Sequence, residues 1–449
     1  MPPFPDVGII IAGAGGSTEL LAEADTDGTL YDMFSIKGLG SGRGIRFQDI
    51  RITYTVPESL PTTTPVAIRV TSGQNVTCHR MYFNNCFTAM YLDNGSLECG
   101  VFDSTIVYNN WGFADKSDAP GLLFLGGAEN YVLNCIISQT PGVENVVGII
   151  VSPAGGAIFI TNCHISDFTI GIWIQAGGTN LARVFGSNVI CESLTSSLYI
   201  VPIVDTAQIY QVYFSDCSFG AANDSADTSS AGVIIDTDGG GDSQVSDIFL
   251  NNCMCYGWSA AGVIINKGQN IVITGGRYGS NKYMSTGAGI SITGTAANVT
   301  VNGADLTPVV AGGFPTQPFA LSVTAAVNGL YVHGCNMTGY PSSTGPVFAS
   351  SAGSQIEITN CPGYNDQTVE VTASAPASGA RFNGTTYGYY GPTTFYIIGT
   401  GITAIKVASS PTATAITTGL LSGAFRLDPG EWGEIDKGVG VVTFALIGT

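Results

Sequence analysis

Apolar and polar residues alternate along most of the chain in short runs, and each run ends in a similar phrase. Runs such as Ala157–Ile160 and Ile271–Ile273 predict β-strands. The phrase that follows is Asn or a substitute and then a small residue, often Cys. Clear copies end at Cys86, Cys135, Cys163, Cys217, Cys253, Cys335 and Cys361, and weaker copies end at Ile50, Thr105, Asn188, Gly276 and Ala304. The copies recur about 28 residues apart, a spacing typical of solenoids.

The residue before the small position predicts a sharp bend. It is Asp49, Asn85, Ser104, Asn134, Asn162, Ser187, Asp216, Asn252, Gly275, Gly303, Gly334 or Asn360. Most of these residue types tolerate left-handed backbone angles or hydrogen-bond to their own backbone. The period suits one coil of three short strands, stacked on the next coil at about 4.8 Å. The pattern therefore predicts an all-β fold, a parallel β-helix of about 11–12 coils with the cysteines stacked in its bore.

A second phrase, a small residue followed by apolar-x-apolar, occurs once per coil. Ser291 and Ser322 stand at its middle position, which is therefore predicted to face outward. The outward column reads Tyr91, Phe124, Ile150, Trp173, Ile234, Ile264, Ser291, Ser322 and Phe348. An aligned apolar column indicates a subunit interface or a sugar-stacking surface. The simpler alternative is chance exposure of β-forming residues.

Composition and charge exclude several classes of protein. The chain has 449 residues, only 11% of them charged, and a formal net charge of −18, so nucleic acid is not an expected partner. There is no apolar run long enough for membrane insertion, and the start lacks the basic head and apolar stretch of a signal peptide. The 11 cysteines are predicted to be packing thiols that stay reduced, and no metal or cofactor is predicted.

Two domains are expected. The β-helix is predicted to occupy residues 1–380, after which the pattern changes near Phe382. Short runs with turn signals between them then predict antiparallel strands at 395–398, 404–407, 423–427 and 441–447. We expect 381–449 to be a small C-terminal antiparallel β module, sandwich-like, that serves trimerisation or carbohydrate binding.

The chain resembles a known superfamily in its opening Ile10–Thr18 and in its Thr-Asn-Cys bends and Gly-Ile-x-Ile strands. These features are similar to the pectate-lyase-like right-handed parallel β-helix proteins. The tail segments 400–405 and 425–431 resemble the terminal module of bacteriophage tailspike and tail-fibre proteins. The resemblance implies a homotrimer in a virion tail, assembled in the host cytoplasm, that binds and often cleaves bacterial polysaccharide: capsule, exopolysaccharide or lipopolysaccharide O-antigen.

Hydrolysis of a glycosidic bond needs two carboxylates, about 5–5.5 Å apart for retention and about 6.5–9.5 Å apart for inversion. Aligning 157–163 on 182–188 places Asp167 directly under Glu192, so these two residues are the predicted catalytic pair of a glycoside hydrolase. Trp173 is expected to stack a sugar ring, and Arg183 to orient a charged substituent. In the alternative interpretation, both acids are hydrated turn residues on the outside of the coil.

Two further regions are candidates for substrate binding. Asp236 and Asp238 precede the turn at Gly239–Gly241, and Asp242 follows it. This cluster indicates a second carboxylate site, a calcium loop or simply a solvated turn. Trp111 stands in a long aromatic and acidic loop that is expected to contact ligand or to pack on a neighbouring subunit.

The sequence is also compatible with two other functions. A polysaccharide lyase or fructan-processing enzyme is one alternative, since Arg277, Lys282 and Tyr283 form the one basic and aromatic cluster of the coils. A non-catalytic fibre or adhesin that only binds glycan is the other.

Overall fold

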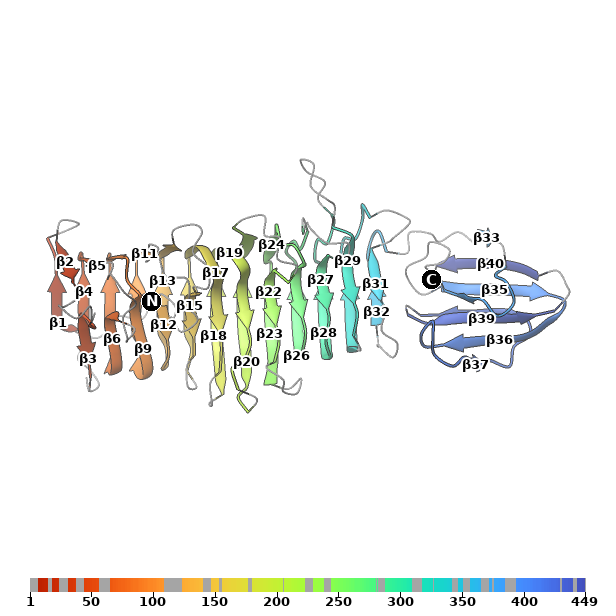
Figure 1. Cartoon of the computed structure of the whole chain (residues 1–449), viewed down its shortest axis with the longest axis horizontal. Coiled ribbons are helices and arrows are strands. Elements are labelled where there is room, and N and C mark those ends of the chain that lie inside the picture. The colour runs from red at the N-terminus through yellow and green to blue at the C-terminus, as the bar shows by residue number, and fades with distance from the viewer. Residues whose placement is uncertain are drawn as a thin grey trace. The chain divides into compact units, whose positions relative to one another are not determined.

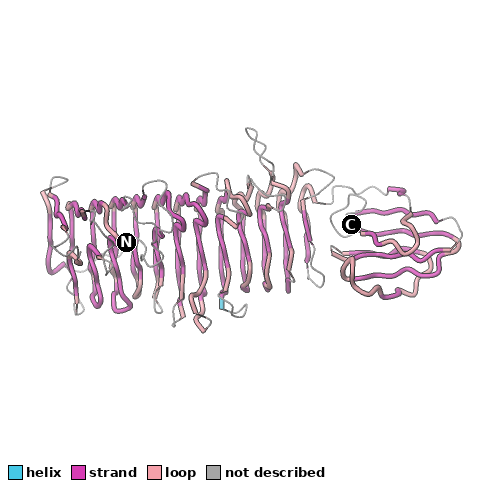
Figure 2. Tube along the Cα trace, viewed as in Figure 1, coloured by secondary structure: helices cyan, strands magenta, loops and turns pink. Residues whose placement is uncertain are grey.

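The structure is a computed structural model. It describes residues 7–14, 18–23, 31–37, 44–55, 65–108, 123–139, 147–152, 156–176, 180–204, 206–222, 229–237, 244–279, 281, 287–308, 317–325, 327–340, 346–349, 356–364, 371–373, 375–383, 393–428, 430–438 and 442–448. Strand is the dominant element in these residues, and none of their helical segments is long and apolar enough to span a membrane (Figure 2). The chain divides into two compact units, Met1–Trp258 and Ser259–Thr449.

In the first unit the chain winds in coils, and each coil contributes strands to three faces. The first face contains β1 (Val7–Ala12), β4 (Gly44–Gln48), β7 (Val76–His79), β10 (Gly100–Phe102), β13 (Asn130–Leu133), β16 (Ile158–Thr161), β18 (Leu181–Ser187), β20 (Ile209–Ser215) and β23 (Val245–Asn251). Each of these strands pairs in parallel with its counterpart in the next coil. Figure 1 shows the stack of coils.

The second face of the first unit follows the bend that ends each first-face strand. It contains β2 (Glu19–Ala22), β5 (Arg51–Tyr54), β8 (Tyr82–Asn84), β11 (Thr105–Tyr108), β14 (Ile136–Gln139), the first half of β17 (His164–Ile174) and of β19 (Ile190–Ile200), β21 (Ser218–Ala221) and β24 (Met254–Tyr256). All of these neighbours pair in parallel.

The third face completes the coil. It contains β3 (Phe34–Ile36), β6 (Val66–Gln74), β9 (Thr88–Leu97), β12 (Leu123–Leu125), β15 (Val147–Val151), the second half of β17 and of β19, and β22 (Ala231–Ile235). The inward side chains of the three faces, such as Ile160, Ile165 and Ile172, are fully buried. This apolar bore is what the period-2 alternation of the sequence predicts.

The second unit has the same coil pattern and then an antiparallel module. Its first-face strands are β26 (Gly268–Thr274), β28 (Ala296–Asn302), β30 (Val327–His333) and β32 (Ile356–Thr359), and its third-face strands are β25 (Ala261–Ile265), β27 (Ala288–Ile292), β29 (Phe319–Val323) and β31 (Val347–Ala349). Both sets pair in parallel. The predicted fold class, an all-β right-handed parallel β-helix followed by a small antiparallel module, is confirmed.

The antiparallel module contains two four-stranded sheets. One has the order β33 (Val371–Ala373), β40 (Val442–Gly448), β35 (Thr393–Gly399) and β38 (Gly423–Leu427), and the other β34 (Arg381–Phe382), β39 (Trp432–Lys437), β36 (Ile402–Ala408) and β37 (Ile416–Thr417). Phe382, Phe395 and Phe444 pack with Ile405 and Ile435 in a shared core. The boundary placed between residues 380 and 381 stays a prediction.

The Asn bends form as the sequence predicts at most coils. Asn134, Asn162 and Asn252 all have φ between 51° and 56°, in the left-handed region. Side-chain amides also connect successive bends: Asn162 Nδ2 donates to Asn134 Oδ1 at 3.1 Å. Each bend therefore lies directly over the previous one.

At one coil Arg80, with φ of 50°, forms the bend after β7, and the predicted Asn85 follows β8 instead. At two further coils the bend lies one residue away from the predicted position. The left-handed residues are Asp103 and Asn188 rather than Ser104 and Ser187. Asp and Asn take up left-handed angles more readily than Ser, and Ser104 instead turns inward and accepts a hydrogen bond from Met81 N at 3.0 Å. Since a shift of one residue exchanges the two sides of a strand, it changes which later residues face outward.

A second column of left-handed residues lies just before the first-face strands or at their third positions, and the sequence did not indicate it. It contains Asn75, Glu98, Glu129, Arg183, Gln211, Asp247, Asn270, Asn298 and Gly329, with φ between 53° and 87°. In the second unit Asn298 Nδ2 donates to Asn270 Oδ1 at 3.2 Å. The chain therefore turns twice per coil through residues in the left-handed region.

All 11 cysteines are buried and free. Burial raises the pKa of the Cys99 thiol to about 11 and that of Cys191 to about 12. Because nucleophilic attack needs the thiolate, burial makes Cys99 and Cys191 poor nucleophiles. A hydrogen bond with the neighbouring thiol lowers the pKa of Cys163, Cys217 and Cys361 instead.

Candidate functional site

The outward positions of five second-face strands of the first unit form one continuous surface. Following the bend, β14, β17, β19, β21 and β24 each present their first and third residues outward. These residues are Ile136, Ser138, His164, Ser166, Ile190, Glu192, Ser218, Gly220, Met254 and Tyr256, aligned in register. We call this set the Glu192 surface.

The Glu192 surface is unusually apolar for exposed positions. Ile136, Ile190 and Met254 are 51%, 47% and 44% exposed, and Tyr256 is 38% exposed. Single exposed apolar residues need no explanation, whereas several aligned on one face mark a binding surface. Exposed apolar side chains therefore gather on the second face, whereas the sequence predicted them on the third.

Glu192 is the one carboxylate at these ten positions, and two side chains flank it. Its Oε2 atom lies 3.5 Å from Nε2 of His164. In the other direction its register neighbour is Gly220, which in turn pairs with Tyr256. A Cβ atom at Gly220 would lie 2.8 Å from both Cζ and the hydroxyl oxygen of Tyr256, so the tip of the ring occupies the space over this glycine. An acid, an imidazole and a phenol thus share one small area.

The predicted stacking of Asp167 on Glu192 is wrong. The residue beside Glu192 is Ser166, and the pairing then continues from Phe168 to Ser193. Asp167 is the extra residue of a bulge, with φ of 69°. The alignment failed because Asn188 occupies the bend above Asn162, donating to its Oδ1 atom at 2.8 Å, and so moves the following strand by one position. Whether either acid is catalytic stays a prediction.

Trp173 and Arg183 lie elsewhere in the coil. Trp173 is at the other end of β17, on the third face, where it pairs with Tyr199 and its ring is tilted against that of Tyr199 at 5.9 Å. Arg183 lies in β18 in the second column of left-handed residues, with φ of 65°. Trp173 lies away from the Glu192 surface, and the roles of both residues stay predictions.

The remaining predicted binding residues are only partly described. Asp236 follows β22, and its Oδ1 atom accepts a hydrogen bond from Thr237 N at 2.7 Å. Asp238, Trp111, Lys282 and Tyr283 lie outside the described residues. In the part of the chain that the structure describes, no group of three His, Cys, Asp or Glu side chains could hold a metal ion.

The predicted outward column of the third face exists but is largely covered. Phe124 aligns with Tyr91 and with Ile150, yet Ile150 and Ile234 are buried. The rings of Tyr91 and Phe124 stack at 4.4 Å, and Arg69 covers Tyr91 at 4.8 Å from its centroid. The column members therefore shield one another, and they do not form the exposed stripe predicted from the sequence.

An aromatic ladder lies on the outer side of the first face. Tyr131, Phe159, Phe185, Tyr213 and Phe249 stack in register with centroids 5.1, 5.3, 5.3 and 4.6 Å apart. The interplanar angles do not exceed 13°, so each ring covers the face of the next. Since a sugar stacks on the face of a ring, these rings are poorly placed to bind one, and the ladder mainly stabilises coil stacking.

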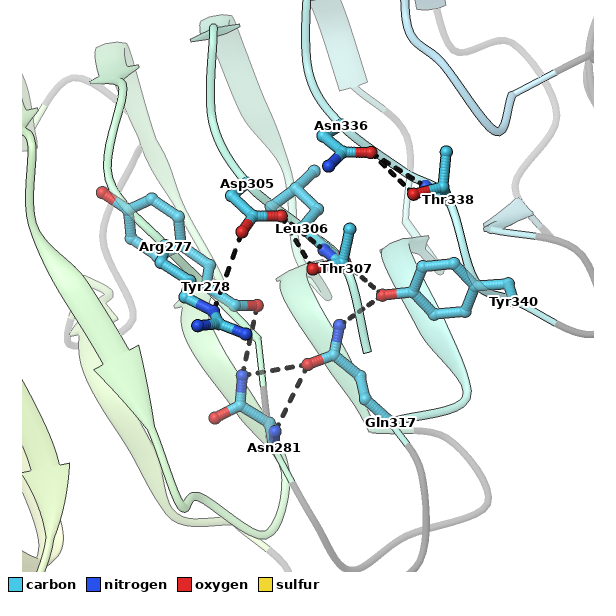
Figure 3. A network of polar contacts seen from close by, with 10 residues as sticks. All are labelled: Arg277, Tyr278, Asn281, Asp305, Leu306, Thr307, Gln317, Asn336, Thr338 and Tyr340. Carbon is cyan, nitrogen blue, oxygen red and sulfur yellow. Dashed lines mark hydrogen bonds and ion pairs between the residues drawn. The ribbon is translucent and has the colours of Figure 1, made fainter. Parts of the chain in front are cut away.

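A polar network in the second unit occupies the equivalent place after the bend, and Figure 3 shows its ten residues. We call it the Arg277 network. Arg277, Asp305 and Asn336 align in successive coils, and Arg277 Nε lies 3.7 Å from Asp305 Oδ2. Asp305 Oδ1 accepts hydrogen bonds from the amide and the hydroxyl of Thr307, at 3.1 and 2.8 Å. Asn336 makes the same turn with Thr338.

The inner part of the Arg277 network is buried. Tyr340 accepts a hydrogen bond from Gln317 Nε2 at 2.6 Å and donates to the carbonyl of Leu306. Gln317 Oε1 also accepts from Asn281 Nδ2 at 3.2 Å. Burial raises the pKa of Tyr340 well above its usual range, so the phenol stays protonated and cannot act as a base at neutral pH. This part of the network holds coils together.

Comparison with known proteins bears on the fold alone. No family model and no curated protein matches the sequence. The structure is similar to the crystal structure of the Dettilon tailspike protein, with a TM-score of 0.52 and 11% identity over 96% of this chain and 87% of that one. It is also similar to a variant tailspike protein of E. coli bacteriophage HK620 in complex with a pentasaccharide, with a TM-score of 0.45 and 11% identity over 98% and 86%.

The resemblance to tailspike β-helices that the sequence indicated is therefore confirmed for the fold. At 11% identity it assigns no residue a role. Three residues of the Glu192 surface, His164, Gly220 and Tyr256, were missed as site residues. They could have been found by counting from each bend, since Gly220 and Tyr256 are the third residues after Cys217 and Cys253.

Proposed function

We propose that this protein is a tailspike-like depolymerase that binds and hydrolyses a bacterial surface polysaccharide, namely capsule, exopolysaccharide or lipopolysaccharide O-antigen. The observation that carries the proposal is the Glu192 surface: an exposed carboxylate beside an imidazole and a phenol, on an apolar face of a rigid coil stack. Likeness of fold to a tailspike protein supports the choice of a glycan as ligand.

The proposed reaction uses Glu192 and Asp167 as its two carboxyl groups. One donates its proton to the glycosidic oxygen as the bond from that oxygen to the anomeric carbon breaks. The other removes a proton from water as the water oxygen bonds to the anomeric carbon. The bulge at Asp167 supports this assignment, because bulges re-aim side chains next to active sites.

We also propose an oligomeric state for the protein and a role in glycan binding for five further residues. The protein acts as a homotrimer in a virion tail, and the C-terminal module serves trimerisation or carbohydrate binding. Trp173, Arg183, Trp111, Asp236 and Asp238 contact the glycan outside the cleavage point. Sedimentation of the full chain tests the trimer, since a monomer would contradict it.

Incubation with a panel of capsular and lipopolysaccharide glycans tests the function. We expect new reducing ends for one glycan, without the ultraviolet absorbance of an unsaturated product. That absorbance would indicate a lyase instead, and binding without products would indicate an adhesin.

Single substitutions Glu192→Gln and Asp167→Asn then test the site, with Glu129→Gln, an exposed acid at a bend, as the matched control. Loss of activity in both site variants and not in the control supports the assignment. Full activity in both site variants would refute it.

A further inference from the structure

Gly220 has no side chain within the Glu192 surface, and we call its place the notch. Ser166, Glu192, Gly220 and Tyr256 stand in adjacent strands, in register, at about 4.8 Å per strand. Gly220 is the only one of the four without a side chain, and the tip of Tyr256 leans into its place. The phenol therefore lies between its own strand and the strand of Glu192, so that a sugar resting on it would reach the carboxylate.

The column beside the notch is apolar. Ile190 aligns with His164 and Ser218, and Ser218 aligns with Met254. Ile190 and Met254 are nearly half exposed. Methyl groups of a ligand placed against these two side chains would gain the free energy of burying apolar surface on both sides.

Charge at the notch disfavours an anionic ligand. None of the ten positions of the Glu192 surface is Lys or Arg, and one is a carboxylate. The chain as a whole carries a formal charge of −18. A uronate or phosphate on the ligand would thus meet like charge, and the one imidazole of this surface, His164, already lies 3.5 Å from Glu192.

Resting on the proposed function, we infer that the Glu192 surface selects a neutral glycan rich in methyl groups, such as a 6-deoxyhexose or an N-acetylhexosamine, and that Tyr256 is its stacking residue. The apolar face of the sugar lies on the phenol ring, and its methyl group lies against Ile190 and Met254. Gly220 is a positioning residue, since it leaves the ring of Tyr256 the room to lean toward Glu192.

Affinity measurements on the full chain test this inference. The probes are a polysaccharide rich in 6-deoxyhexose and N-acetylhexosamine and, as the anionic counterpart, polygalacturonate. We expect binding of the first only. Tyr256→Ala should weaken binding about tenfold, and Tyr256→Phe should restore it, because stacking needs the ring and not the hydroxyl.

Two further variants separate a binding role from a structural one. Gly220→Ala places a methyl group 2.8 Å from the Tyr256 ring and is expected to weaken binding severalfold at unchanged thermal unfolding. Tyr331→Ala, at an exposed tyrosine of β30, is the matched control and should leave the affinity unchanged.

The outcomes separate the inference from the function on which it rests. Preferential binding of polygalacturonate, or full affinity in Tyr256→Ala, would overturn the inference while leaving a glycan-binding protein. Failure to bind or cleave either probe or any glycan of the wider panel would overturn the proposed function, and the inference with it.

Discussion

The Glu192 surface and the exposed part of the Arg277 network occupy equivalent places in the coil, because both follow the bend directly, yet their chemistry differs. In the Arg277 network each polar group already has a partner within the chain: Arg277 pairs with Asp305, and Asp305 also accepts from Thr307. On the Glu192 surface, by contrast, Ile190 and Met254 expose apolar area to solvent.

This difference separates a surface that stabilises the fold from one that can gain by binding. Polar groups satisfied inside the chain would have to exchange those hydrogen bonds for contacts with a ligand, which brings little net free energy. Exposed apolar side chains lose only water when a ligand covers them. The coil fold therefore allows the same position to serve either purpose, depending on which residues follow the bend.

The largest expected effect is on catalysis. Glu192→Gln should lower the rate of polysaccharide cleavage at least 100-fold, since general acid–base groups contribute about 10²–10⁴-fold. Asp305→Asn removes the carboxylate of the Arg277 network and should leave the rate within about twofold. Release of reducing ends by the two variants, at equal protein concentration, is the measurement. An equal loss of cleavage rate in both variants would contradict the proposal that the Glu192 surface, and not the Arg277 network, is the catalytic site.

The next effect is on stability, and it should fall on the Arg277 network. Tyr340→Phe removes a hydroxyl that both accepts from Gln317 and donates to Leu306, so one N–H of the Gln317 amide and the carbonyl of Leu306 lose this hydrogen bond, while the amide keeps its bond to the carbonyl of Phe319. The expected cost is about 1–3 kcal/mol in the free energy of unfolding. Tyr256→Phe removes an exposed hydroxyl and should cost less than about 0.5 kcal/mol. Denaturant unfolding of both variants checks this, and a reversed order would contradict it.

A smaller loss of stability is expected at the exposed part of the same network. Asp305→Ala breaks the ion pair with Arg277 and the two hydrogen bonds from Thr307. Both partners remain open to water, so we expect about 1 kcal/mol or less. High salt should reduce only the part of this loss that comes from the ion pair, because salt screens charges and leaves the two hydrogen bonds from Thr307 unchanged. A cost like that of Tyr340→Phe would mean that this carboxylate supports the fold more than its exposure implies.

The smallest effect on stability should come from the apolar column. Ile190→Thr replaces a half-exposed side chain by another β-former, so the free energy of unfolding should change by less than about 0.5 kcal/mol. Glycan affinity should nevertheless fall. Parallel unfolding and binding measurements check the pair of results, and a destabilised variant with normal affinity would place Ile190 in the fold and not in the site.

Much of the fold could be predicted from the sequence because one physical event recurs in every coil. An Asn at a left-handed bend, as at Asn134 and Asn162, is visible in the sequence and fixes where each strand ends. The Cys residues that follow these two bends are buried, as expected for the first inward position after each bend. Four strands of the antiparallel module, β35, β36, β38 and β40, were also predictable from their alternating runs and turn residues, whereas β39 was not predicted.

The site was harder to predict because it depends on single residues. Because the bend is at Asn188 and not at Ser187, Glu192 pairs with Ser166 and not with Asp167. Nothing in the sequence indicated the bulge at Asp167. Tyr256 stands beside the buried Cys255, and no motif in the sequence marks it. Register errors of one residue leave a predicted fold intact, while they exchange the inner and outer residues of a strand.

The structure of the inactive Glu192→Gln variant with an oligosaccharide of its own polysaccharide would test the central claim most directly. We predict that the sugar lies over Gly220, with its apolar face on Tyr256 and a glycosidic oxygen within hydrogen-bonding distance of residue 192. A sugar bound over Arg277 and Asp305, with the Glu192 surface empty, would contradict the account.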